Sequence, residues 1–210
     1  MAFSSVYEMF APFTTVRKQH FWDYFSGATL NSRWTVNNHS FNGTATMNDA
    51  IDGGVRITGG TGTNYSCEIN FNDIRPFAHD GSVFIGVCKP NLDYGTTNMF
   101  ADIGFASPDY RSATDQSTFN IHTGQTYIRI KSGSTSANTS YQDTTVSSAN
   151  TRHTLKLELN GTVTTPSIDG VLQSTKSNPP DTNLQPFAQA WRGNSGTAQL
   201  DVNYIEVYNT

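Results

Sequence analysis

The chain has 210 residues, of which 36% are hydrophobic, 12% aromatic and only 14% charged, and its formal net charge is −4. This length suits one large all-β domain of about 200–250 residues, and the aromatic content can furnish a core despite the low charge. The acidic balance, with no basic run longer than Arg17-Lys18, argues against nucleic acid as a partner. No apolar run approaches the ~18–20 residues of a membrane-spanning helix, so no membrane partner is expected.

Residues 1–20 differ from the rest of the chain because they gather apolar and aromatic side chains without a clear period. These side chains, with the first one beyond the segment, are Phe3, Tyr7, Met9, Phe10, Phe13 and Phe21. The segment lacks the basic start of a secretory signal peptide, and Glu8 and Pro12 interrupt it, so we expect synthesis in the cytoplasm without a signal peptide. An exposed arm of this kind would be sticky. Two alternatives stay open: the arm packs on its own domain, or it anchors the protein to a partner.

From Phe21 onward the sequence predicts short strands separated by turn residues. The alternation of apolar and polar residues is clearest in 127–131 and 153–159, and a period of two places one face of each strand in a core. Asn160-Gly161 and Asp169-Gly170 are strong hairpin-turn signals. The predicted strands are 44–48, 55–58, 66–74, 82–88, 99–105, 118–123, 127–131, 151–159, 163–168, 171–174, 187–192 and 198–208. So many strands at hairpin spacing predict one all-β domain over residues 21–210, built as two stacked antiparallel sheets.

The two cysteines, Cys67 and Cys88, fall in the consecutive predicted strands 66–74 and 82–88, which we expect to form a hairpin. The geometry of such a hairpin would allow a disulfide between Cys67 and Cys88. Two cysteines in a chain of this length do not make a disulfide framework, however, and the favoured interpretation is two buried free thiols.

Three segments, in this order, resemble the concanavalin A-like lectin and glucanase superfamily. The first is FWDYFSG at 21–27 followed by Arg33-Trp34, which is similar to the opening strand of bacterial endo-β-glucanases. The second is 154–174, whose IDGVL resembles an "xDGxL" hairpin turn, and the third is LDVNYIEVY at 200–208, like a closing strand. The resemblance covers about 21–208. It implies a concanavalin A-like jelly-roll sandwich, here preceded by the N-terminal arm.

The resemblance also allows a test for catalysis. Glucanases of this superfamily carry Glu-Ile-Asp-Ile-Glu-Phe on one strand of the concave sheet, where a period of two aligns the acids that a retaining mechanism needs. The best match is FADIGF at 100–105, in which Asp102 survives but Phe100 and Gly104 stand in place of the glutamates. The glutamates of the chain, none with a second carboxylate two residues away, are Glu8, Glu68, Glu158 and Glu206. We therefore expect no enzyme, with a catalytic Asp pair from separate loops as the alternative.

Calcium is the one cofactor that the resemblance suggests. Superfamily members often bind a structural Ca²⁺ through main-chain carbonyls and an Asp on the last strand. The matching position is Asn203, with Asp201 two residues earlier, and the lost charge should weaken such a site. Asp49 and Asp52 form a second candidate, for which an Asx turn is the favoured interpretation. The scattered histidines predict no zinc site.

Strand alternation predicts one candidate binding face. In 100–105, 118–123 and 187–192, alternate apolar residues are expected in the core, which leaves the others facing outward. A glycan site combines an aromatic plane with a few convergent polar groups. The candidate glycan-binding residues are Trp191, Phe100, Asp102, Asn120, His122 and Gln189, and the loop residues expected to rim them are Tyr94, Tyr110 and Arg111. The alternative is that Phe100 and Trp191 are core residues of a differently curved sheet.

The leading functional hypothesis is a non-enzymatic virion surface protein, such as a phage head decoration, head fibre or tail-associated protein. The uncharged polar composition suits life outside a cell, and lysis releases phage proteins that lack a secretion signal. Its expected partners are capsid or tail proteins, bound through residues 1–20, sister copies in a homo-oligomer, and host glycans. The alternatives are a free carbohydrate-binding module and an unorthodox glycoside hydrolase or lyase.

Overall fold

The computed structural model describes residues 19–39, 42–48, 53–60, 65–95, 98–107, 115–134, 139–193 and 196–210. Within these ranges the regular elements are all strands, which confirms the predicted all-β class. No described helix could cross a membrane. Of the predicted arm, residues 1–18 lie outside the described part of the chain, and His20 already belongs to the first strand.

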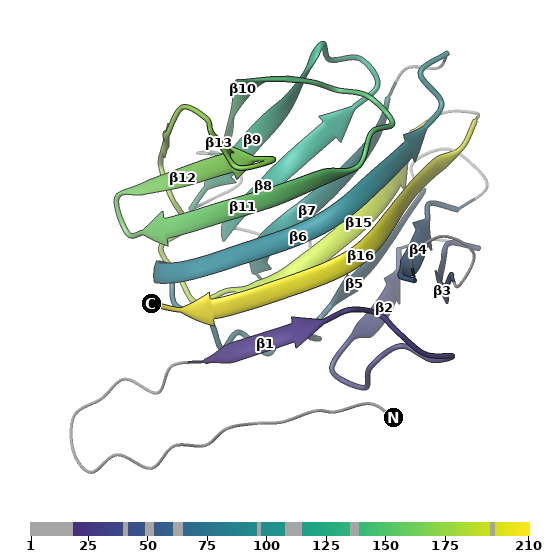
Figure 1. Cartoon of the computed structure of the whole chain (residues 1–210), viewed down its shortest axis with the longest axis horizontal. Helices are drawn as coiled ribbons and strands as arrows, with labels where there is room; N and C mark the ends of the chain where they lie inside the picture. The colour runs from purple at the N-terminus through teal and green to yellow at the C-terminus, as the bar shows by residue number, and fades with distance from the viewer. Residues whose placement is uncertain are drawn as a thin grey trace.

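Two antiparallel sheets pack face to face as a sandwich (Figure 1). The larger sheet has the order β13-β12-β11-β6-β16-β4-β3, and β1 and β14 pair with β16 and β12. Its strands are β1 (His20–Asp23), β3 (Thr44–Met47), β4 (Val55–Thr58), β6 (Asp80–Leu92), β11 (His153–Asn160), β12 (Val163–Ile168), β13 (Val171–Leu172), β14 (Lys176–Ser177) and β16 (Ala198–Asn209). We call it the nine-stranded sheet.

The seven-stranded sheet has the order β10-β9-β8-β7-β15-β5-β2. Its strands are β2 (Thr35–Asn38), β5 (Tyr65–Asn70), β7 (Met99–Ser107), β8 (Asp115–His122), β9 (Tyr127–Gly133), β10 (Ser140–Ser147) and β15 (Gln185–Arg192). The strands β7, β8 and β15, which carry the predicted site residues, lie side by side near its middle.

The core lies between the sheets and follows the predicted alternation. In β11, Leu155, Leu157 and Leu159 are buried, and the residues between them face outward. Phe105 of β7 meets Phe84 of β6 across the sandwich with ring centroids 5.6 Å apart. Each fully buried side chain of this size contributes about 1.5–3 kcal/mol, so apolar burial fixes the two layers together.

The opening segment folds around one aspartate. Asp23 Oδ1 accepts a hydrogen bond from the Phe25 amide at 2.7 Å, and Asp23 Oδ2 accepts one from Trp34 Nε1 at 3.0 Å. Burial raises the pKa of this carboxyl group. The Trp34 ring packs against Phe21 at 5.6 Å and Phe71 at 5.0 Å. These contacts explain why the FWDYFSG segment and Arg33-Trp34 occur together.

Besides β1, which only the resemblance of residues 21–27 indicated, three strands were not predicted, namely β2, β10 and β14. β2 and β10 are the outermost strands of the seven-stranded sheet, and β14 pairs only with β12. A strand at an edge has few apolar neighbours to pack against, so sequences such as TVNN and SYQDTTVS lack the apolar alternation that reveals a central strand.

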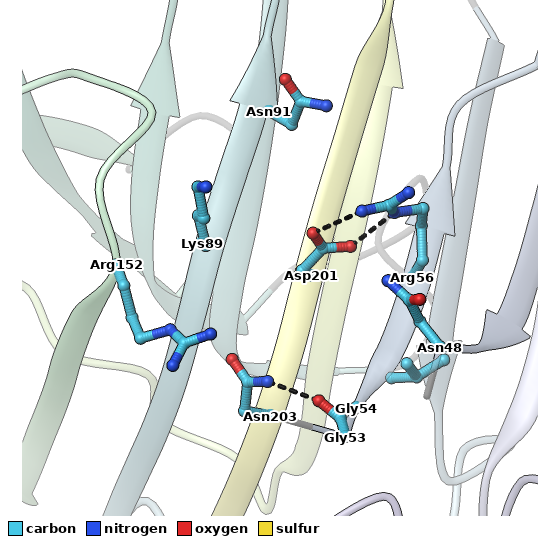
Figure 2. A pocket seen from close by; sticks show the side chains of 10 residues that line it. Asn48, Gly53, Gly54, Arg56, Lys89, Asn91, Arg152, Asp201 and Asn203 are labelled. Atoms are coloured by element: carbon cyan, nitrogen blue, oxygen red, sulfur yellow. Dashed lines mark hydrogen bonds and ion pairs between the residues drawn. The ribbon is translucent and has the colours of Figure 1, made fainter. Parts of the chain in front are cut away.

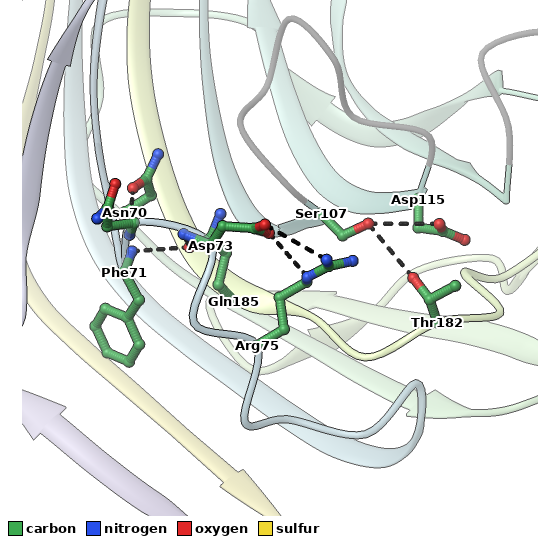
Figure 3. Close-up of polar contacts among 9 residues, drawn as sticks. Asn70, Phe71, Asp73, Arg75, Ser107, Asp115, Thr182 and Gln185 are labelled. Carbon is green, nitrogen blue, oxygen red and sulfur yellow. Dashed lines mark hydrogen bonds and ion pairs between the residues drawn. The ribbon is translucent and has the colours of Figure 1, made fainter.

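The predicted strand 66–74 is too long, because β5 ends at Asn70. Asn72 and Asp73 adopt positive φ angles of 51° and 64°, which a strand does not allow. Gln185 Oε1 accepts hydrogen bonds from the amides of Phe71 and Asp73, both at 3.0 Å (Figure 3). A side chain distant in sequence therefore ends this strand.

The expected hairpin containing Cys67 and Cys88 is wrong. The chain crosses after Asn70 to the other sheet, so Cys67 lies in the seven-stranded sheet and Cys88 in the nine-stranded sheet. Both cysteines are free and buried, and burial raises the pKa of each thiol to about 12. They act as small apolar core residues.

Candidate functional site

The register of the seven-stranded sheet brings the six predicted glycan-binding residues together. Phe100 pairs with Trp191 and with His122. Residues directly opposite one another in antiparallel strands share a face, so the six residues form two adjacent rows on the outer face of the sheet. The second row is Asp102 between its partners Gln189 and Asn120. The intervening residues, including Ala101 and Ile103, are buried in the core as predicted.

The first row is a ladder of three aromatic rings. The Phe100 ring stacks on Trp191 with centroids 4.7 Å apart and planes at 17°, and on His122 at 6.0 Å and 11°. All three are half-buried on the outer face, so Phe100 and Trp191 are not core residues. Phe100 covers one face of the Trp191 indole, and the cross-strand neighbour of Trp191 on the other side is the small, buried Ser66.

His122 enters the ladder as a neutral ring. Burial lowers its pKa, and the charge of Arg129 lowers it further. Its Nδ1 accepts a hydrogen bond from the Gly124 amide at 2.8 Å, which leaves the proton on Nε2. The imidazole is therefore a stacking ring with one outward donor at pH 7.

The second row lies beneath the surface, contrary to the expectation that its residues contact a ligand. Asp102 and Gln189 are fully buried, and Asn120 is 3% exposed. Asn120 Nδ2 donates to Asp102 Oδ1 at 2.6 Å, and Gln189 Nε2 donates to Asp102 Oδ2 at 3.1 Å. Asn120 Oδ1 in turn accepts from Arg129 Nη2 at 2.8 Å. The row therefore orients Arg129, whose guanidinium lies 4.2 Å from the centroid of the Tyr141 ring.

Sequence reasoning missed Arg129 and Tyr141. The alternation in 127–131 could have placed Arg129, because Ile128 and Ile130 are buried core residues. Tyr141 could not be found in the same way, since its edge strand β10 carries no apolar pattern. Tyr141 is 48% exposed and adds an accessible ring to this face.

A second carboxylate lies on the row of Asp102, which the sequence did not indicate. Glu68 of β5 pairs with Gln189 and is fully buried. Its Oε1 accepts from Asn70 Nδ2 at 2.6 Å, and its Oε2 lies 3.1 Å from His39 Nε2. Because Gln189 separates Glu68 from Asp102, their backbones are two strand spacings apart, about 10 Å. Glycosidases hold their carboxyl groups about 5–5.5 Å apart when they retain and about 6.5–9.5 Å apart when they invert, and in both classes the acids must reach the sugar. Both Asp102 and Glu68 are fully buried.

Gly104 stands where the resemblance places the second glutamate, and its backbone admits no side chain. Its φ is +150°, a conformation that residues with a Cβ rarely adopt. A Cβ here would lie 2.5 Å from the Ser117 carbonyl oxygen and 2.9 Å from Leu157 Cδ1. Leu157 belongs to the facing sheet, so the expectation that position 104 points outward is wrong.

The calcium candidates lie beside a cavity of about 160 Å³ on the nine-stranded sheet. Asp201 binds Arg56 through two contacts, from Nε at 2.7 Å and Nη2 at 2.8 Å. Asn203 Nδ2 donates to the Gly53 carbonyl oxygen at 2.6 Å (Figure 2). Lys89 and Arg152 also line the cavity.

The contacts of Asp201 and Asn203 offer a calcium ion few oxygen ligands, although Asn203 Oδ1 is buried and has no hydrogen-bond partner in the described part of the chain. Calcium requires several converging oxygen ligands with negative charge. Here Asn203 directs its amide nitrogen at the carbonyl that would share a cation, and an arginine already occupies both oxygens of Asp201. Across the described ranges no cluster of three or more acidic, His or Cys side chains could hold a metal. The other candidates, Asp49 and Asp52, lie outside the described residues, as do the predicted rim residues Tyr110 and Arg111.

From the backbone conformation of Gly104 we predict that a glutamate cannot be introduced at this position without loss of stability. Gly104→Glu should lower the free energy of unfolding by about 1–3 kcal/mol from backbone strain alone, with a further loss from the clash with Ser117. Urea denaturation measures this change. Gly95→Ala, at an exposed glycine with no positive φ, is the control and should unfold like the wild type. A Gly104→Glu protein as stable as the wild type would contradict the assignment.

The amide at position 203 makes a prediction about metal dependence. Neither EDTA nor millimolar Ca²⁺ should change the melting temperature of the wild type. Asn203→Asp removes the donor and sets a carboxylate against the Gly53 carbonyl, so it should cost about 1–3 kcal/mol in EDTA. Thermal melts of the wild type and of Asn203→Asp, each with and without Ca²⁺, test these expectations. A wild-type melting temperature that rises clearly with Ca²⁺ would show that the cavity holds a cation.

No protein-family model matches the sequence, and no curated protein does. Solved structures do match, and three represent them. A native glycosidic hydrolase superposes with a TM-score of 0.67 at 14% identity, over 93% of this chain and 98% of that one. The Bacillus licheniformis β-glucanase gives 0.63 at 12% identity, over 91% and 98%. The carbohydrate recognition domain of Emp47p gives 0.62 at 10% identity, over 90% and 94%.

At this identity the likeness establishes the fold and leaves the activity to be argued from the site. The structures it joins include sugar-cleaving enzymes and a sugar-recognition domain. Their two-sheet fold is the one that the resemblance of segments 21–27, 154–174 and 200–208 implied. The chain has the two-sheet jelly-roll fold of the concanavalin A-like lectins and glucanases.

Proposed function

We propose that this chain is a non-enzymatic carbohydrate-binding protein, and that the outer face of its seven-stranded sheet binds the glycan. One observation carries this proposal: the face presents rings and one arginine, while the two carboxylates at its centre, Asp102 and Glu68, are fully buried under side-chain amide donors. The exposed carboxylate of the face, Asp143, lies opposite Arg129 on the edge strand β10. A glycosidase needs an acid at the reacting bond. A binding site needs accessible rings and oriented polar groups.

The accessible layer of this face is suited to a sugar. The ladder of Trp191, Phe100 and His122 is an apolar surface along one side of the row that contains Asp102. Tyr127 is 42% exposed and Tyr141 48% exposed on the neighbouring strands. Arg129 lies between the ladder and Tyr141, held by Asn120, and its remaining N–H groups are available as donors to sugar hydroxyls or acidic groups.

An unorthodox glycoside hydrolase is the second candidate. It is favoured by the names of the similar structures, most of which describe sugar-cleaving enzymes. Against it stand the buried oxygens of Asp102 and Glu68 and the closed backbone at Gly104. A reaction that uses these two acids would require the sheet face to open so that one of them reaches the substrate.

The binding proposal predicts a loss of affinity on removing the half-buried Trp191 ring at the end of the ladder. Trp191→Ala should weaken glycan binding about tenfold or more, which equals about 1.4 kcal/mol or more. A glycan array followed by calorimetry on the best ligand measures this. Leu172→Ala, at a 67% exposed residue of the other sheet, is the control. Turnover on a polysaccharide panel that is abolished by Asp102→Asn or Glu68→Gln would replace this proposal with the hydrolase.

We propose the surface of a phage particle as the setting, with capsid or tail proteins and sister copies as partners. The uncharged polar composition supports it, together with the apolar residues of the 1–20 segment. Mass spectrometry of purified particles should detect the chain in stoichiometric amounts. Its recovery only from non-particulate host fractions would overturn this setting while leaving the glycan site to be judged by its own variants.

A further inference from the structure

A second cluster of aromatic side chains lies on the outer face of the nine-stranded sheet, where β1 pairs with β16. His20 lies opposite Tyr208, and Trp22 opposite Glu206. Tyr24, just beyond β1, packs on Tyr204. The alternate residues of these strands, such as Ile205 and Val207, are buried in the core, so the rings face the other way. We call the five rings the aromatic strip: His20, Trp22, Tyr24, Tyr204 and Tyr208.

The rings of the aromatic strip form two groups of contacting rings, one around His20 and one around Tyr24. The centroid of His20 lies 5.0 Å from that of Trp22 and 5.7 Å from that of Tyr208. The centroids of Tyr24 and Tyr204 are 4.7 Å apart. Positions 204 to 208 of a strand span about 13 Å, so the strip is elongated. Tyr24 is 61% exposed and the His20 side chain 48%, so the strip is open to solvent.

One carboxylate lies at the centre of the aromatic strip, and both of its oxygens are oriented. His20 Nε2 donates to Glu206 Oε1 at 2.9 Å, and the Tyr204 hydroxyl donates to Glu206 Oε2 at 2.7 Å. Burial and the Glu206 charge raise the pKa of Tyr204, so its hydroxyl stays protonated and keeps donating. The Glu206 side chain is 24% exposed and retains lone pairs that can accept further hydrogen bonds.

We propose that the aromatic strip is a second glycan-binding site, with Trp22 and Tyr24 as stacking surfaces and Glu206 as an acceptor for sugar hydroxyls. The carboxylate favours a sugar over an apolar protein surface, because burying this charge is costly, whereas a sugar presents hydroxyl donors to the lone pairs that His20 and Tyr204 leave free. The inference extends the proposed function, since the strip lies on the sheet opposite the ladder of Trp191. One molecule could therefore hold two glycan chains and gain avidity on a polymer.

The test compares full-length variants of the two sites on a glycan array and on insoluble chitin, cellulose and mixed-linkage β-glucan. Tyr24→Ala should weaken binding to polymeric glycan about tenfold, while Tyr24→Phe, which keeps the ring, should bind like the wild type. Trp191→Ala removes the other site, and the double variant Trp191→Ala with Tyr24→Ala should lose binding altogether. Because Tyr24 is largely exposed, the two single Tyr24 variants should melt like the wild type.

The outcomes separate the two sites. If Tyr24→Ala binds every glycan like the wild type while Trp191→Ala does not, this inference is overturned and the proposed function stands. If only Tyr24→Ala loses binding, the strip is a glycan site and the seven-stranded face is not. Sedimentation of each variant completes the test, because a change of oligomeric state in Tyr24→Ala would make the strip an interface between copies and overturn the inference. A wild type that binds no glycan overturns both proposals.

Discussion

The buried carboxylate of Asp102 is the constraint on which the seven-stranded face depends. A carboxylate taken out of water needs donors for its oxygens, and leaving one unpaired costs several kcal/mol. Antiparallel pairing places Asn120 on one neighbouring strand and Gln189 on the other, each within hydrogen-bond distance. The register of β8, β7 and β15 is thereby tied to these hydrogen bonds. A slip by one residue would expose core residues and leave the Asp102 carboxylate without its donors.

The same arrangement covers the carboxylate that lies at the middle of this sheet, on a fold that the chain shares with sugar-cleaving enzymes. An acid that donates a proton or attacks a sugar must be reachable, but the oxygens of Asp102 are occupied by amides and covered. The neighbouring position, Gly104, has adopted a backbone conformation that brings β7 close to β8 and leaves no room for a side chain. The backbone at position 104 thus excludes a glutamate side chain unless the neighbouring strand shifts.

Side-chain amides also donate hydrogen bonds at positions where a charged group could otherwise do so. At the cavity of the nine-stranded sheet, Asn203 joins the last strand to the Gly53 carbonyl directly, where a cation could otherwise connect the two. Glu68 is held by Asn70 in the other sheet. In both sheets a neutral amide supplies the donor that a carboxylate or a carbonyl needs. This fits a composition that is rich in uncharged polar residues and has only 14% charged ones.

The sequence by itself determined the all-β class, most central strands and the side of each strand that enters the core, because alternation with a period of two is a local property of burial. It also placed the six candidate residues on one face, since strand pairing conserves the parity of alternate residues. Only the tertiary structure decided which of them are accessible. Asp102, Asn120 and Gln189 lie beneath rings and an arginine brought in by neighbouring strands. The sequence could not reveal Tyr141, the separation of Cys67 from Cys88, or the aromatic strip. Each depends on which strands become neighbours, and pairing between distant segments leaves no local pattern.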